Sequence, residues 1–161
     1  MMELYFRDRF FSRGVTEIMD ETGAAMGQLD LESSLTSSVS VYGPDAILRY
    51  AGSFRFFSSK WEVRDAAGTE LGVLRYRLSF FSKRYEYDAG YRGVYEIEAE
   101  PFSKHYTVRD ESGSEVASFE KISGWLEAGA FRLRNYSDRL DSYELVAVIM
   151  GVNGIHRQQS S

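Results

Sequence analysis

A gap-free repeat with a step of 45 residues is the feature that most limits how this chain can fold. Segments 16–29, 61–74 and 106–119 align, and each carries the pattern Asp-x-x-Gly between alternating apolar and polar residues. Asp suits the first position of a type I turn and Gly tolerates the positive φ that follows. We therefore predict three β-hairpins. Their turn residues are Asp20 and Gly23, Asp65 and Gly68, and Asp110 and Gly113.

Each repeat unit has room for about four strands of roughly 6 to 8 residues with their turns. Aromatic segments precede the hairpins at 5–11, 50–57 and 94–102, and further extended segments follow at 35–41, 78–87 and 130–136. Three such units predict about twelve antiparallel strands. The 11 Phe, 11 Tyr and 2 Trp suit the half-buried surfaces of these strands.

An apolar run without a polar face, Leu-Val-Ala-Val-Ile-Met-Gly-Val at 145–152, lies near the C-terminus. Asp141 and Glu144 precede it with the spacing of a capping box, and Gly154 follows as a candidate C-cap, so we predict a helix over about 142–153. About twelve residues reach only ~18 Å, too short for a bilayer span, so protein must enclose the helix. A buried strand is the alternative. The expected core contacts are Leu145, Val148, Ile149 and Val152.

Twelve strands and one apolar helix predict a mainly β protein, a closed antiparallel barrel around a central hydrophobic C-terminal helix. A closed wall of this size needs something to fill its interior, since about eight strands already enclose a lumen that side chains can fill. Closure also removes exposed strand edges. A two-sheet sandwich with the helix across one open end is the alternative. We expect one domain over residues 1–157 and a disordered tail at 158–161.

The chain resembles the LURP-one-related proteins of the tubby C-terminal-like superfamily, whose fold is shared with phospholipid scramblases. The resemblance covers nearly the whole chain and rests on three features: the Asp-x-x-Gly hairpins, the late apolar run, and aromatic-Ser segments at 10–12, 56–58, 80–82 and 102–103. It implies the closed twelve-stranded barrel, and tubby proteins bind a phosphoinositide through basic residues. The chain has 2 Pro and no Cys, so the Pro-rich region and palmitoylated Cys cluster of scramblases are missing.

The resemblance implies a non-enzymatic barrel that binds anionic phospholipid or a membrane-associated partner through its outer surface. The formal net charge is −5, but residues 49–84 hold eight Lys and Arg against three Asp and Glu. Cations near an anionic surface contribute about 1 kcal/mol each. The candidate contacts are Arg75, Arg77, Lys83 and Arg84. Their alternative role is a solvated strand face paired to nearby Glu.

Other titratable residues favour structural roles. Glu96, Glu98 and Glu100 alternate on one strand face, where we expect cross-strand ion pairs with Arg132 and Arg134 rather than a metal site. His105 and His156 are too few for a histidine-rich metal site. No nucleophile, P-loop or dinucleotide motif is present in the sequence, so we expect no catalysis and no cofactor.

Two other functions remain open. The first is a protein-interaction or structural module without lipid binding. The less favoured one is a small-ligand carrier or enzyme that uses a pocket at the barrel end, because a lumen filled by the helix has no room for a substrate. The acidic net charge disfavours nucleic acid. The N-terminal segment lacks the apolar core of a secretory signal, so we expect a cytoplasmic protein, peripheral at the membrane and without a transmembrane span.

Overall fold

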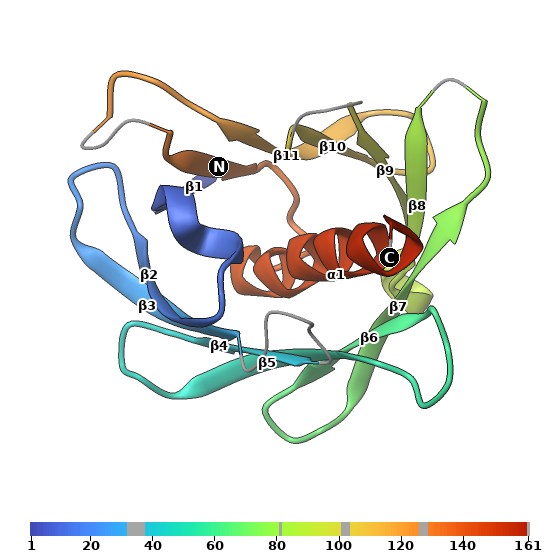
Figure 1. Cartoon of the computed structure of the whole chain (residues 1–161), viewed down its shortest axis with the longest axis horizontal. Helices are drawn as coiled ribbons and strands as arrows, with labels where there is room; N and C mark the ends of the chain where they lie inside the picture. Colours follow the sequence, from blue (N-terminus) through green and yellow to red (C-terminus); the bar gives the residue numbers. More distant parts are fainter. Residues whose placement is uncertain (32–37, 81, 101–103, 126–128, 161) are drawn as a thin grey trace.

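The computed structural model describes residues 1–31, 38–80, 82–100, 104–125 and 129–160. Within these ranges the chain forms twelve strands, one long helix and two short 3-10 helices (Figure 1). The strands are β1 (Met2–Phe6), β2 (Gly14–Met19), β3 (Ala25–Leu31), β4 (Ser38–Tyr42), β5 (Leu48–Phe54), β6 (Trp61–Asp65), β7 (Glu70–Arg77), β8 (Lys83–Asp88), β9 (Val94–Ala99), β10 (Tyr106–Arg109), β11 (Glu115–Lys121) and β12 (Phe131–Asn135). The helices are η1 (Asp8–Phe11), η2 (Gly90–Arg92) and α1 (Ser142–Ser160).

The strands pair antiparallel in chain order and close into a barrel. Closure depends on β1, which pairs with β2 on one side and with β12 on the other, where Leu4 lies opposite Leu133. The closed twelve-stranded barrel is confirmed, and the two-sheet sandwich is wrong. Each repeat unit contributes four consecutive strands, β1–β4, β5–β8 and β9–β12.

The three repeats fold into hairpins with the same hydrogen bonds. In the first, the Gly23 N–H donates to the Asp20 carbonyl at 3.0 Å, and one carboxylate oxygen of Asp20 accepts from the N–H groups of Thr22 and Ala24. Gly23 has a φ of +87°, the left-handed conformation that glycine adopts without strain. The Thr22 hydroxyl, followed by backbone N–H groups, lowers the pKa of Asp20. The equivalent pairs are Asp65 with Gly68 and Asp110 with Gly113.

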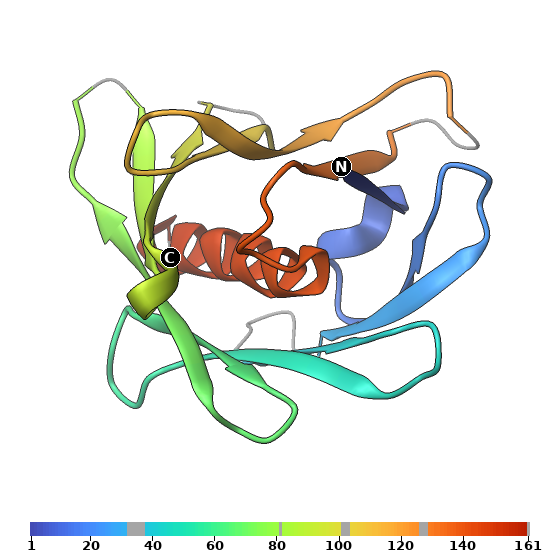
Figure 2. The same cartoon turned by 180° about the vertical axis from the view of Figure 1, so that it is seen from behind.

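The helix α1 runs inside the ring of strands, as Figures 1 and 2 show from opposite sides. Asp141 caps its first turn, because its carboxylate accepts from the Tyr143 N–H at 3.0 Å. The helix continues to Ser160, so the end expected near residue 153 and the tail expected from 158 are wrong. Gly154 does not cap the helix. It lies within it, and a Cβ there would be 3.4 Å from the ring of Phe54.

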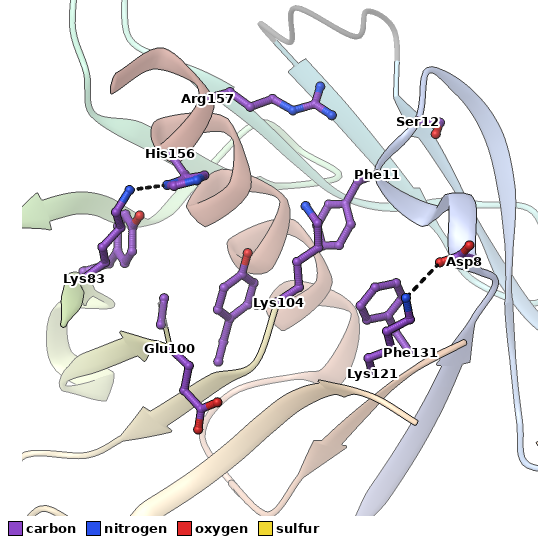
Figure 3. Close-up of a pocket in the computed structure, with 13 residues that line it drawn as sticks. Asp8, Phe11, Ser12, Lys83, Glu100, Lys104, Lys121, Phe131, His156 and Arg157 are labelled. Atoms are coloured by element: carbon purple, nitrogen blue, oxygen red, sulfur yellow. Dashed lines mark hydrogen bonds and ion pairs between the residues drawn. The ribbon is translucent and has the colours of Figure 1, made fainter. Parts of the chain in front are cut away.

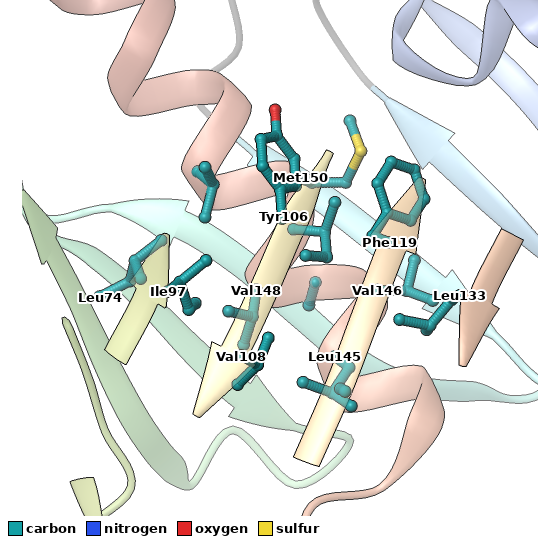
Figure 4. Close-up of a cluster of buried hydrophobic side chains, with 14 of the residues drawn as sticks. Leu74, Ile97, Tyr106, Val108, Phe119, Leu133, Leu145, Val146, Val148 and Met150 are labelled. Carbon is teal, nitrogen blue, oxygen red and sulfur yellow. The ribbon is translucent and has the colours of Figure 1, made fainter. Parts of the chain in front are cut away.

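The helix packs eccentrically against β4–β7. Its side chains at Leu145, Val148, Ile149 and Val152 are buried, and Figure 4 shows Leu145 and Val148 among the inward side chains of the wall. Aromatic rings fill part of the opposite side of the lumen. This cluster is Phe6, Phe10, Phe11, Phe119 and Phe131, with neighbouring ring centroids 4.2–5.9 Å apart.

Strand direction gives the barrel two distinct ends. We call the first the start end, because α1 begins there and Asn135, at the close of β12, donates a 3.0 Å hydrogen bond to Ser142. The three Asp-x-x-Gly hairpins and η2 lie at this end, which faces the viewer in Figure 2. We call the other the finish end. There His156, in the last turns of α1, contacts Lys83 at the beginning of β8.

Candidate functional site

The structure separates the four cations that the sequence suggested for lipid contact. Arg75, Arg77 and Arg84 lie on the outer wall, where Arg75 and Arg77 are 2.5 and 3.7 Å from Glu86. Lys83 lies on the inner face of β8, which also carries the buried Tyr85. The outer pairs are partly exposed, so each contributes at most about 1 kcal/mol. These arginines can therefore exchange a carboxylate for another anion at little cost.

The alternating glutamates of β9 form outward ion pairs, but not with the expected arginines. Arg84 of β8 holds both Glu96 and Glu98, the latter at 2.9 Å. The expectation failed because β9 lies between β8 and β10, whereas β12 lies between β11 and β1. Arg132 donates to Glu120 and Arg134 to Glu3, both at 2.8 Å. Among the residues that the structure describes, no cluster of three acidic, His or Cys side chains could hold a metal ion.

A cavity of about 580 Å³ opens at the finish end. It lies between the last turns of α1, the inner faces of β8–β12 and η1 (Figure 3). The expectation that a helix-filled lumen has no room for a small molecule is therefore wrong, because the eccentric helix leaves space on the side away from β4–β7. Its apolar lining consists mainly of Phe11, Tyr85, Tyr106 and Phe131. Burial raises the pKa of Tyr85 to about 12, so these tyrosines stay neutral.

Cations line this cavity among the aromatic rings. The Lys104 ammonium lies 3.0 Å from the Asn153 side-chain oxygen and 4.0 Å from the centre of the Phe11 ring. Burial, reinforced by Arg157, lowers the pKa of Lys104. Lys83 donates to the Nδ1 atom of His156 at 2.6 Å, and burial followed by the nearby lysines lowers the pKa of His156. His156 is therefore neutral at pH 7 and accepts this hydrogen bond.

The two carboxylates of the cavity lining are engaged elsewhere. Asp8 lies 3.8 Å from Lys121, and Glu100 lies 3.2 Å from the Nδ1 atom of His105. Figure 3 shows the Glu100 carboxylate directed away from Lys83 and Lys104. No described carboxylate forms an ion pair with either of these lysines, whose nearest partners are neutral. With Lys121 and Arg157, the lining has four cations and two carboxylates, a net +2 in a protein of net −5.

At the start end, a buried ion pair anchors the helix. Arg92 of η2 donates to both carboxylate oxygens of Glu144 at 2.7 and 2.9 Å, and the Tyr87 hydroxyl donates to the same carboxylate at 2.6 Å. Burial and the Glu144 charge raise the pKa of Tyr87. The sequence assigned Glu144 to a capping box, but its carboxylate is held by these two partners instead. All three side chains are partnered, so we regard this cluster as structural.

Two loops at the finish end expose large apolar side chains. Phe56 and Phe57 lie between β5 and β6, and Leu78 and Phe80 lie between β7 and β8; all four are 87–94% exposed. Phe57 has a φ of +52°, which costs about 1 kcal/mol in a residue with a Cβ. Burial of the ring does not offset this cost. Phe81, Phe102 and Ser103 of the aromatic-Ser segments lie outside the described residues.

Charge is unequally divided between the two ends. In the sequence, the segments that join strands at the finish end, with the residues from 156 onward, contain seven Lys and Arg against four Asp and Glu. The segments at the start end contain two Arg against seven Asp and Glu. The finish end is therefore net positive and the start end net negative. In an anionic field the molecule would turn its finish end toward the anion.

No family model matches the chain, and no curated protein matches it. A solved structure, the X-ray structure of a protein from Arabidopsis thaliana, is similar in fold. Its TM-score is 0.65 at 14% identity, and the match covers 94% of this chain and 90% of that one. The likeness spans nearly all of both chains and concerns the fold alone. Within the described residues, no helix has both the length and the apolar character needed to cross a membrane.

Proposed function

We propose that this protein is a LURP-one-related, tubby-like barrel that acts without catalysis and docks on anionic phospholipid through its finish end. The observation that carries the proposal is a pair of loops with exposed apolar tips, each with basic residues at its base. Arg55 and Lys60 flank the tip formed by Phe56 and Phe57. Arg77 and Arg84 flank the tip that carries Leu78 and Phe80.

This arrangement matches the layered chemistry of a bilayer surface. Apolar tips can enter the acyl region, where burying a large side chain fully contributes about 1.5–3 kcal/mol. Cations at the feet of the loops would then lie at the depth of the phosphates, each contributing about 1 kcal/mol. Arg55 and Arg77 already hold Glu62 and Glu86 on the outer wall. Lipid phosphates would compete with these carboxylates, so docking is expected to weaken as salt rises.

The proposal assigns different roles to the four cations suggested by the sequence. Arg77 and Arg84 lie beside the β7–β8 loop and contact headgroups directly. Arg75 lies two residues farther along β7 and contributes through its charge. Lys83 lies on the inner face of β8 and lines the cavity rather than the outer surface. The acidic start end, with its three Asp-x-x-Gly turns, faces away from the lipid.

Vesicle sedimentation tests this proposal. Wild-type protein should bind phosphatidylcholine vesicles that contain about 30% phosphatidylserine, and binding should fall between about 0.1 and 0.5 M NaCl. The double variant Phe56→Ser, Phe57→Ser should bind at least about tenfold more weakly than the wild type, because two rings leave the acyl region. Tyr91→Ser is the matched control, since Tyr91 is 98% exposed but lies at the start end. It should bind as the wild type does.

Two results would overturn the proposal. One is equal binding to neutral and anionic vesicles, or none to either. The other is an equal loss from the Phe56 and Phe57 double variant and from Tyr91→Ser. The absence of vesicle binding, together with a stable co-purifying protein, would support the protein-interaction module instead.

A further inference from the structure

We infer that the finish-end cavity binds one small anionic amphiphile, a molecule in which an acid group is joined to an aromatic or aliphatic body. The inference rests on two groups of residues that line the same cavity. Lys83 and Lys104 have neutral hydrogen-bond partners, and they lie beside an aromatic wall that includes Phe11 and Tyr106. The inference goes beyond membrane docking, because it concerns a single molecule held inside the barrel rather than a lipid surface outside it.

The cavity has the size and walls of a small-molecule site. Its volume of about 580 Å³ falls within the ~300–1,000 Å³ range of ligand pockets. Tyr85 and Tyr106 line it from β8 and β10, and Phe11 and Phe131 line it from η1 and β12. Ala99 of β9 adds only a methyl group, which helps to keep the space open. An apolar body of one or two rings, or a medium-length acyl chain, would fit against these walls.

The charges of the lining specify the sign of the ligand. Lys104 has lost much of its hydration, and its ammonium contacts an amide oxygen and a ring face instead of a carboxylate. Lys83 contacts a neutral imidazole. Arg157, on the last turns of α1, adds a third positive group (Figure 3). An acid group that reached any of these cations would form charge-assisted hydrogen bonds, which are roughly twice as strong as neutral ones.

The ion pairs described above for the lining carboxylates are with residues other than Lys83 and Lys104. Glu100 is paired with His105, and Asp8 is paired with Lys121 on the far side of the cavity. A cationic or metal ligand would meet a net charge of +2, and a purely apolar ligand would leave Lys83 and Lys104 without an anion. A carboxylate, sulfonate or phosphate with an apolar body meets both requirements of the site.

A matched pair of fluorescent probes tests the inference on the full chain. The first probe, 1-anilinonaphthalene-8-sulfonate, carries an acid group, and the second, N-phenyl-1-naphthylamine, has the same rings without it. Fluorescence titration should show that the sulfonate probe binds at least tenfold more tightly than the neutral one. Equal affinity for the two probes would overturn the inference, because it would indicate non-specific apolar binding.

Variants locate the site. Lys104→Met and Lys83→Met each remove one cation and keep an apolar stem, so each should weaken sulfonate binding about tenfold and leave the neutral probe unchanged. Arg13→Met is the matched control, since Arg13 is an exposed finish-end cation outside both the cavity lining and the two apolar loop tips. Unchanged sulfonate binding in both cavity variants, with thermal melting like that of the wild type, would overturn the inference. Ala99→Leu provides a second test, because added volume in the cavity should weaken both probes.

Competition distinguishes two sources of the same ligand chemistry. Displacement of the sulfonate probe by decanoate but not by 2-naphthoate would identify a lipid-derived acid, and the reverse would identify a soluble aromatic acid. Displacement by neither acid, or by inorganic phosphate alone, would overturn the inference. The double variant Phe56→Ser, Phe57→Ser should retain probe binding while losing vesicle binding. Vesicle binding therefore tests membrane docking and probe binding tests the cavity site, so a failure of one can be told from a failure of the other.

Discussion

Replacing Gly151 by Ala should destabilise the barrel, although Ala is the better helix former. Gly151 lies inside α1, where a Cβ would stand 2.4 Å from Cδ1 of Trp61. The Trp61 ring is fully buried, and its Nε1–H donates to the Ala147 carbonyl at 3.1 Å. The ring therefore cannot move aside without loss of packing and of this hydrogen bond.

The magnitude follows from three opposing contributions. Gly to Ala in a helix interior gains about 1 kcal/mol. Overpacking a filled core costs about 1–3 kcal/mol, and leaving the Trp61 donor unsatisfied costs about 1–3 kcal/mol more. We expect a net loss of about 3 kcal/mol in the free energy of unfolding. In a chain of this size that corresponds to a fall of about 6–12 °C in Tm.

Gly154→Ala provides the matched control in the same helix. A Cβ there would lie 3.4 Å from the Phe54 ring, an ordinary contact, so the helix-propensity gain should persist and stability should rise by up to about 1 kcal/mol. Urea unfolding followed by far-ultraviolet circular dichroism gives both values. If Gly151→Ala is as stable as the wild type or more so, the close approach of Trp61 to α1 is not a constraint and the reasoning is refuted.

Three further changes test other parts of the structure. Glu144→Gln leaves the Arg92 guanidinium facing a neutral amide, so urea unfolding should show a loss of about 3 kcal/mol; an unchanged midpoint would contradict the role of this pair. Phe57→Asn should relieve backbone strain, because Asn tolerates the left-handed conformation of this position better than Phe does. Tm should rise by the equivalent of about 0.5–1 kcal/mol while vesicle binding falls, and a lower Tm would contradict this. His156 has a folded pKa below its unfolded value of about 6.5, so the unfolded state binds the proton first and this site reduces stability as pH falls below neutrality. His156→Gln should therefore lose less stability than the wild type between about pH 7 and 5, as measured by thermal melting at each pH; equal losses would show that the site does not contribute.

The barrel could be predicted because its signals are local. Asp-x-x-Gly determines a hairpin through hydrogen bonds within five residues, as the identical contacts of Asp20 and Asp110 show. Regular spacing of such turns fixes the number of strands, and an apolar run too short for a bilayer indicates a buried helix. These inferences need no knowledge of distant residues.

The features that could not be predicted depend on distant partners. Gly154 has the sequence pattern of a helix end, but α1 continues past it to Ser160, inside the wall formed by distant strands. Glu144 has the spacing of a capping box, but Arg92, remote in sequence, holds its carboxylate. The cavity depends on the eccentric position of α1, which no local pattern encodes. Phe10 and Phe56 show the same limit, because both belong to Phe-Phe-Ser segments yet one is buried and the other is exposed.

The barrel closes by pairing β1 with β12 around α1, and this order of elements affects folding during synthesis. A ribosome synthesises the wall first and the segment that fills it last, so a nascent chain that has emerged only as far as β12 presents an empty shell with uncovered apolar inner faces. Such a chain exposes apolar surface of the kind that makes partly folded proteins prone to aggregate. A product truncated before residue 142 lacks the segment that fills the wall, so we expect it to aggregate rather than to fold.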